Sequence, residues 1–191
     1  MRLRFFRIVL ALVAVSLALG GSVLAATPPT PGIETTPIPT NAKPDWSSMK
    51  FLSGSWSCST RSSRRAEPFL TNVTTSADST GYWMVSKSVT PKLSWATGIT
   101  SIDMITYDPQ QHRWADVYTD DQGGYDVSFS PGWKGAMIVW TDALFVPGPD
   151  IIAASPLTVT KVSDTKTTAH STFTEKSGTV RTLDVTCTKA G

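Results

Sequence analysis

Two cysteines, Cys58 and Cys187, are the only ones in the chain and lie near opposite ends of a region rich in strand-forming residues. A disulfide between them requires their Cα atoms to come within about 7 Å of each other. The edge strands of an open sheet of many strands lie several strand spacings apart, so a Cys58–Cys187 bond would mean that the sheet closes on itself. Two separate free thiols are the alternative.

The region from residue 45 onward has the pattern of an all-β domain. Thr, Ser, Val and aromatic residues dominate it, and no segment shows a sustained apolar stripe at helical spacing. Short runs of alternating polarity are separated by turn residues such as Asp108-Pro109. We expect strands at residues 50–60, 66–77, 81–90, 97–107, 112–120, 123–130, 133–142, 156–163, 167–175 and 179–188. Because most connections are short, these strands should pair as an up-and-down meander, which predicts a closed antiparallel β-barrel.

One connection, from Ala143 to Ala154, is longer and apolar, and it contains Pro147-Gly148-Pro149. It is either an irregular crossover or a lid over a cavity, and the pattern favours the crossover.

The two cysteines share the more apolar face of their strands. On the first strand this face carries Trp56 with Cys58, and on the last it carries Cys187 with Lys189. If the cysteines lie directly opposite each other, antiparallel pairing sets Trp56 opposite Lys189. A basic side chain over an indole ring is favourable by ~0.5–2 kcal/mol.

Residues 1–25 have the features of a secretory signal peptide. Three arginines precede an apolar core at residues 8–19, and Val23-Leu24-Ala25 is a small-residue cleavage site. The apolar core is shorter than the ~20 residues that a spanning helix needs. Residues 26–44 are rich in Thr and Pro, which predicts a disordered linker before a barrel domain at 45–191. We therefore expect export to a periplasmic or extracellular compartment, where disulfides persist.

The charge balance argues against a nucleic-acid partner. The chain has 17 Lys and Arg against 15 Asp and Glu, and loss of Arg2, Arg4 and Arg7 with the signal peptide leaves 14 against 15. A near-neutral surface attracts phosphate backbones and anionic headgroups only weakly. Arg61, Arg64 and Arg65 form the one local basic cluster, which we interpret as a solvated turn. We expect a monomer with no integral membrane span.

A family resemblance rests on the segment Phe51-Leu52-Ser53-Gly54-Ser55-Trp56, which opens the first strand with Gly-x-Trp. With about ten meandering strands and a basic residue on the last one, the domain resembles the calycin superfamily of lipocalins, fatty-acid-binding proteins and nitrobindins. It looks closest to bacterial lipocalin-like domains of unknown function. The resemblance implies a barrel with Trp56 closing one end, paired with Arg181 or Lys189, and a cavity for a small apolar or amphipathic molecule.

Two departures limit what the resemblance implies. Fatty-acid-binding proteins insert two helices after the first strand, and residues 62–67 leave no room for them here. Haem-binding nitrobindins carry an iron-ligating histidine close to the C-terminus, whereas the last strand here has none and His170 lies one strand earlier. We therefore expect no haem and no other cofactor.

The candidate ligand-binding residues are mostly aromatic and acidic. Trp114, Asp116 and Tyr118 alternate on one face of the expected strand 112–120, and Trp140 with Asp142 repeats the pairing two strands later. Facing inward, they would suit an amphipathic or cationic ligand; the alternative is that Ala115 and Val117 face inward. Two further candidates are Trp83, as one of seven tryptophans that wall a pocket or fill the core, and Arg181, as a buried anchor for an anionic group or a rim residue.

No motif for acyl or phosphoryl transfer is visible, and the two histidines have no metal-ligand spacing. The leading hypothesis is therefore a carrier or sensor of a small apolar or amphipathic molecule. A non-catalytic structural module of the cell envelope with a filled barrel is the second hypothesis. An enzyme with an acid–base residue inside the barrel is the third.

Overall fold

The computed structural model describes residues 42–94, 97–146 and 150–190. The predicted signal peptide (1–25) and nearly all of the predicted linker (26–44) lie outside these residues, so both stay predictions. In the ranges described, no helix is long and apolar enough to cross a membrane.

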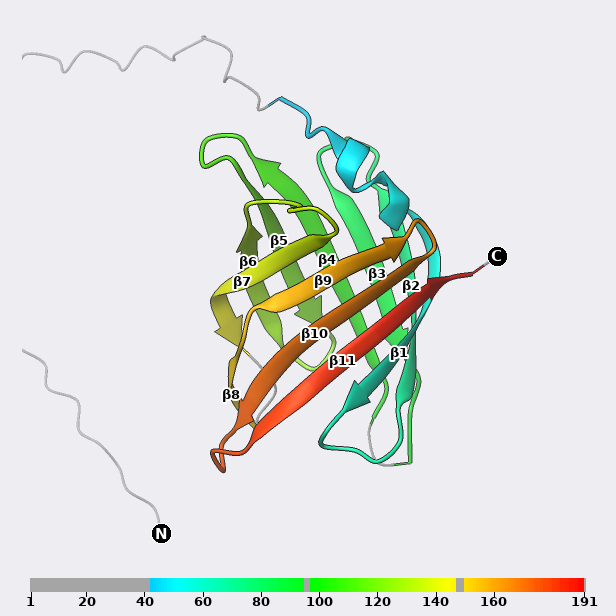
Figure 1. Ribbon diagram of the computed structural model, residues 1–191, viewed down its shortest axis with the longest axis vertical. Coiled ribbons are helices and arrows are strands. Elements are labelled where there is room, and N and C mark those ends of the chain that lie inside the picture. Colours follow the sequence, from blue (N-terminus) through cyan, green and yellow to red (C-terminus); the bar gives the residue numbers. More distant parts are fainter. Residues whose placement is uncertain (1–41, 95–96, 147–149, 191) are drawn as a thin grey trace, which may run out of the picture. The chain divides into compact units, whose positions relative to one another are not determined.

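Two short 3-10 helices precede a series of antiparallel strands (Figure 1). The elements are η1 (Trp46–Ser48), η2 (Lys50–Leu52), β1 (Gly54–Ser62), β2 (Phe69–Ala77), β3 (Met84–Thr90), β4 (Ile99–Asp108), β5 (Arg113–Asp120), β6 (Tyr125–Ser130), β7 (Met137–Val146), β8 (Ile151–Ala154), β9 (Leu157–Ser163), β10 (Lys166–Glu175) and β11 (Val180–Lys189).

Ten of these strands form the closed antiparallel barrel that the sequence predicts. Neighbours in the chain pair from β1 to β7, β7 then pairs with β9, and the series continues through β10 to β11. The barrel closes because β11 pairs with β1, which lies beside it in Figure 1. The eleventh strand, β8, pairs only with the end of β10 and is the one departure from the expected meander.

The closing ladder has the register predicted from the cysteines. Cys58 lies opposite Cys187 with their Cα atoms 3.9 Å apart, and the two form a disulfide. Trp56 lies opposite Lys189, whose Nζ is 5.3 Å from the centre of the indole ring. The same Nζ donates a hydrogen bond to the Phe51 carbonyl oxygen at 3.0 Å. Lys189, rather than Arg181, is therefore the basic partner of Trp56.

The glycine of the Gly-x-Trp segment has a steric role beside this pair. Gly54 has φ +120°, which side chains rarely adopt, and a Cβ at this position would lie 2.9 Å from the Lys189 Cε. The position thus requires glycine so that the Lys189 side chain can cross the strand.

Several predicted boundaries are wrong, and the strand expected at 133–142 starts four residues later, as β7 (Met137–Val146). The strand expected at 50–60 begins only at Gly54, because residues 50–52 form η2. The segment 143–154, predicted to be an irregular crossover or a lid, is mostly strand. Its first residues extend β7 to Val146 and its last form β8, and Pro147-Gly148-Pro149 lie outside the described residues.

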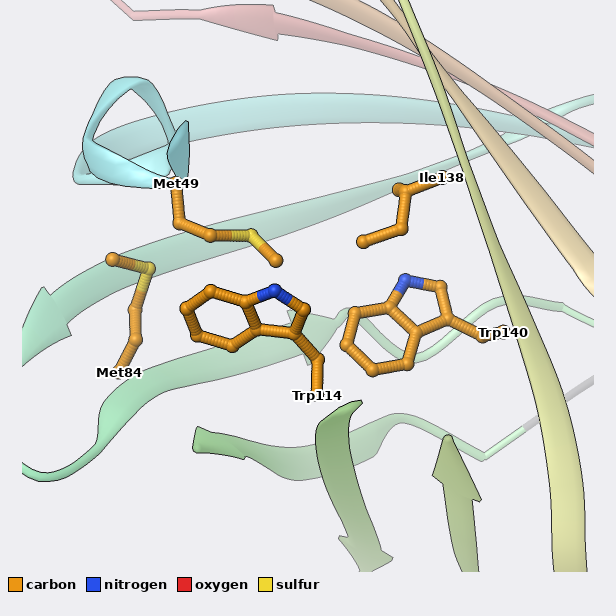
Figure 2. Close-up of a cluster of buried hydrophobic side chains, with 5 residues drawn as sticks. All are labelled: Met49, Met84, Trp114, Ile138 and Trp140. Atoms are coloured by element: carbon orange, nitrogen blue, oxygen red, sulfur yellow. The ribbon is translucent and has the colours of Figure 1, made fainter. Parts of the chain in front are cut away.

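The hydrophobic core fills one end of the barrel, below η1 and η2 (Figures 1 and 2). Figure 2 shows Met49, from the junction of the two 3-10 helices, reaching toward the Trp114 indole, with Met84 beside it and Ile138 and Trp140 opposite. Met49 is 1% exposed. The segment before β1 therefore plugs this end of the barrel with apolar side chains.

Candidate functional site

The other half of the barrel, toward the β1–β2 turn, contains a cavity of about 630 Å³ that is open to the surface. Trp140 marks the boundary between core and cavity, because it belongs to the buried cluster and also lines the cavity. Ligand pockets in proteins typically measure ~300–1,000 Å³. The free space is therefore that of a small-molecule site.

One wall of the cavity is acidic. Four consecutive strands, β4 to β7, contribute Asp103, Asp116, Asp126 and Asp142 to it, and we call these four residues the aspartate cluster. Asp120, at the end of β5, also lines the cavity. Cross-strand pairing places Tyr118 of β5 between Asp103 and Asp126 in one row. Asp116 and Asp142 lie in the adjacent row, separated by one residue of β6. Residues opposite or diagonal across strands have neighbouring side chains, so the four carboxyl groups share one patch of the wall.

Burial and mutual repulsion shift the titration of these carboxyl groups. Burial raises the pKa of Asp103 to about 7, and the nearby Asp126 adds to the shift. The pKa of Asp116 is raised well above its ordinary value by burial and then by Asp103 and Asp126. Burial, followed by repulsion from Asp142, raises the pKa of Asp126 to about 6, and burial also raises the pKa of Asp142. Near neutral pH the aspartate cluster therefore holds part of its carboxyl protons.

Two oxygens of the cluster have no hydrogen-bond partner within the structure. They are Oδ1 of Asp116 and Oδ1 of Asp126, and both atoms are buried. Most buried polar atoms in folded proteins are hydrogen-bonded, so an unsatisfied carboxylate oxygen in a cavity wall needs a physical explanation.

The neighbouring Asp120 contrasts with these carboxylates. Its Oδ1 accepts hydrogen bonds from the backbone N–H groups of Gln122 and Gly124 at 2.9 and 2.8 Å. Its Oδ2 accepts a hydrogen bond from the Tyr118 hydroxyl at 3.1 Å, and burial together with Asp120 raises the pKa of that phenol. Asp120 therefore holds the β5–β6 turn and orients Tyr118.

A second part of the lining is apolar. Leu157, Phe173 and Leu183 reach the cavity from β9, β10 and β11. Phe145 reaches it from β7, because the β6–β7 register shifts at Asp142 and leaves Ala143 without a partner. This β-bulge reverses which alternate residues of β7 face inward, so that Asp142 and Phe145 both line the cavity.

Ion pairs surround the mouth of the cavity. The Nε of Arg64 lies 3.0 Å from Glu175 Oε1, and its Nη2 lies 3.4 Å from Asp150 Oδ2. The Nε of Arg181 lies 3.3 Å from the other oxygen of Glu175. Arg64 and Arg65 lie in the exposed turn between β1 and β2, as predicted, and the Arg64 side chain also links this turn to β10 and to the residue preceding β8.

Only some of the predicted ligand-binding residues lie together in the cavity lining. Asp116, Tyr118 and Trp140 line the cavity, so the inward orientation of this face of β5 is the one that the structure shows. Trp114 lies in the buried core and does not line the cavity; the centre of its ring is 5.3 Å from that of Trp46. Trp83 lines a separate surface depression near the β4–β5 turn.

Arg181 is not among the residues that line the cavity, and Glu175 already neutralises its guanidinium group. A ligand role for any of these predicted residues stays a prediction.

Sequence reasoning missed Asp103, Asp126, Phe145 and Phe173. Polarity is inverted on β4: Asp103 faces inward while Ile102, at 37% exposure, faces outward. Both faces of β4 carry apolar residues, with Ile99, Ile105 and Tyr107 on the inward one, so hydrophobic alternation does not show that Asp103 faces inward. The signal that could have found Asp103 and Asp126 is cross-strand register, because short turns place both of them opposite Tyr118.

In the part of the chain that the structure describes, no three His, Cys, Asp or Glu side chains are grouped so as to hold a metal ion. The aspartate cluster thus lines a patch of wall rather than converging on one point.

No protein-family model and no curated protein matches this chain. Among solved structures, the chain is similar to the crystal structure of Rv2717c from M. tuberculosis, with a TM-score of 0.54 and 10% sequence identity. The match covers 76% of this chain and 97% of the other. At this level of identity the likeness shows a common β-barrel fold and no more.

Proposed function

We propose that this protein is an exported, lipocalin-like barrel that binds a small amphipathic molecule in its cavity. The observation that carries the proposal is the cavity of about 630 Å³, lined on one side by carboxyl groups and on the other by Phe173, Leu157 and Leu183. A pocket with a large apolar lining and a few polar groups is typical of small-molecule sites. The alternative of a filled, purely structural barrel has less support, because only the plugged half is packed with buried hydrophobic residues.

Export is supported by the disulfide and by the N-terminal sequence. A disulfide such as Cys58–Cys187 persists in an oxidising compartment and is rare in a reducing cytosol. Residues 1–25 carry the charge and apolar pattern of a secretory signal.

A neutral fluorescent probe tests whether the cavity is a binding site. N-phenyl-1-naphthylamine emits strongly only in apolar surroundings, so we expect saturable emission with one probe per chain. Two substitutions on β8 form a matched pair. Ala154→Trp places an indole in the cavity lining, whereas Ala153→Trp places the same group on an exposed position.

We expect Ala154→Trp to weaken probe binding about tenfold or more, which corresponds to ~1.4 kcal/mol, and Ala153→Trp to leave it unchanged. Equal binding by both variants would show that the probe binds outside the cavity, and no saturable binding by the native chain would refute the proposal. Native mass spectrometry of protein purified from its own host should then show the mass of the retained ligand.

A further inference from the structure

The unsatisfied oxygens of the aspartate cluster indicate which chemical group the cavity accommodates. Oδ1 of Asp116 and Oδ1 of Asp126 are buried in a wall that adjoins free space, and neither accepts a hydrogen bond from the protein. A buried carboxylate oxygen without a donor is costly, because it loses its hydration without compensation. The backbone N–H of Val117 donates to the Asp116 carboxyl group, but its Oδ1 stays unsatisfied. Both side chains line the cavity, so a small rotation of their carboxyl groups would allow a ligand with several N–H donors to satisfy these oxygens.

The charges around the cavity favour a positive ligand group over a negative one. Besides the aspartate cluster, the charged residues among the described lining are Asp120, Arg64 and Arg65, and its tyrosines are Tyr118 and Tyr125. Both arginines belong to the β1–β2 turn at the mouth, and Arg64 is already paired with Glu175 and Asp150. The lining contributed by β9, β10 and β11 consists of Leu157, Ser171, Phe173 and Leu183, which bring no charge to the opposite wall.

The remaining lining suits the body of such a ligand. Trp140 presents an indole at the cavity floor, and Asp142 lies two residues further along the same strand. An indole ring attracts a cation through its π face, and this attraction is stronger in a site shielded from water. Phe145 and Phe173 offer apolar surface for a hydrophobic or aromatic portion of the molecule.

We propose that the polar group of the ligand is an organic cation, a protonated amine or amidine, that lies against the patch formed by Asp103, Asp116, Asp126 and Asp142. This inference rests on the proposed function, because it requires that the cavity is a ligand site. The cation offsets the mutual repulsion of the four carboxyl groups, which contributes to the raised pKa values of Asp103 and Asp126 in the protein alone. Binding of the cation therefore drives protons off the cluster.

Three ligands that share one naphthalene ring separate the cation from the apolar body: 1-naphthylmethylamine, 1-naphthylmethanol and 1-naphthoate. Isothermal titration calorimetry at pH 8 compares their affinities for the full mature chain. We expect the amine to bind about tenfold or more tightly than the alcohol, and the carboxylate to bind weakest. In Asp116→Asn the amine should lose this advantage, while Asp121→Asn, an exposed aspartate in the β5–β6 turn, should keep it.

The native chain gives a second, independent readout that does not depend on any variant folding. At pH 6.5, calorimetry in buffers of different ionisation enthalpy should detect proton release on binding of the amine and none on binding of the alcohol.

Equal affinities of amine and alcohol without proton release would overturn the cation inference and leave the cavity as a ligand site. Tightest binding of the carboxylate would also overturn it. Failure of all three ligands, together with failure of the neutral fluorescent probe, would instead refute the proposed function itself.

Discussion

At the residue scale, Asp103 shows how a buried carboxyl group couples folding to pH. Its pKa is about 7 in the folded chain, against an ordinary value of 3.8 for an exposed aspartate. Between these two pH values the folded state binds more protons than the unfolded state. The free energy of unfolding therefore decreases as pH rises from about 4 to about 7, and Asp116 and Asp126 act in the same direction.

We predict that Asp103→Asn stabilises the ligand-free protein at pH 8, because the amide removes a buried charge and its repulsion with Asp126. The gain should be on the order of 1–3 kcal/mol at pH 8 and should nearly vanish at pH 4. Urea unfolding of the native chain, Asp103→Asn and the surface control Asp121→Asn, measured at pH 4, 6 and 8, checks this. Parallel stability–pH curves for native chain and Asp103→Asn would contradict the prediction.

At the element scale, the 3-10 segment before β1 acts as a plug for the barrel. Its central residue, Met49, is 1% exposed and contacts the cluster formed by Met84, Trp114, Ile138 and Trp140 (Figure 2). The indole N–H of Trp46, in η1, donates a hydrogen bond to the Gly81 carbonyl oxygen at 3.0 Å, which ties the segment to the β2–β3 turn. The core thus depends on a segment that belongs to no strand.

Truncation of the Met49 side chain tests how much this segment contributes to the free energy of unfolding. We expect Met49→Ala to lower the free energy of unfolding by about 2–4 kcal/mol, because it leaves a cavity in the packed end of the barrel. Met137→Ala is the matched control, since Met137 is 49% exposed on the outer face of β7, and it should cost less than about 0.5 kcal/mol. Chemical unfolding followed by tryptophan fluorescence measures both. Equal small losses would mean that the segment is not part of the cooperative core.

The elements also show which parts of the structure a single sequence can predict. The register of β1 against β11 was predictable, because the disulfide fixes one pair and strand parity fixes the rest. The inward face of β4 was not, because it carries Asp103 inside while Ile102 lies outside. On β7 the bulge at Ala143 changes the parity within one strand, and no single-strand pattern predicts where such a bulge falls.

The acidic wall of the cavity, formed by β4 to β7, could be predicted only in part. Alternation on β5 predicted Asp116 and Tyr118 as cavity residues. Asp126 can be predicted only from the pairing register that places it opposite Tyr118. The plug was missed for a different reason: residues 50–52 continue the apolar pattern of β1, and nothing local separates a 3-10 turn from the start of a strand.

At the scale of the whole molecule, two kinds of link join β1 to β11 and close the barrel: a ladder of backbone hydrogen bonds and a disulfide. The β1–β11 ladder runs from Trp56 opposite Lys189 to Ser62 opposite Leu183, and the Cys58–Cys187 disulfide crosses it. The disulfide also joins residues 129 positions apart in the sequence, so it restricts the unfolded chain strongly. The ladder can therefore close the folded barrel without the disulfide, whereas the disulfide mainly raises the free energy of unfolding by restricting the unfolded chain.

We predict that the double variant Cys58→Ala/Cys187→Ala stays folded and closed but loses about 2–4 kcal/mol of unfolding free energy. The ladder, with Lys189 over the Trp56 ring, holds the strands together in the folded state. Without the cross-link, the unfolded chain gains conformational entropy, and this lowers the free energy of unfolding. Urea unfolding measures the loss, and saturable emission of N-phenyl-1-naphthylamine reports whether the cavity persists. Retained strand content with loss of probe binding would mean that the disulfide, rather than the ladder, keeps the barrel closed around its cavity.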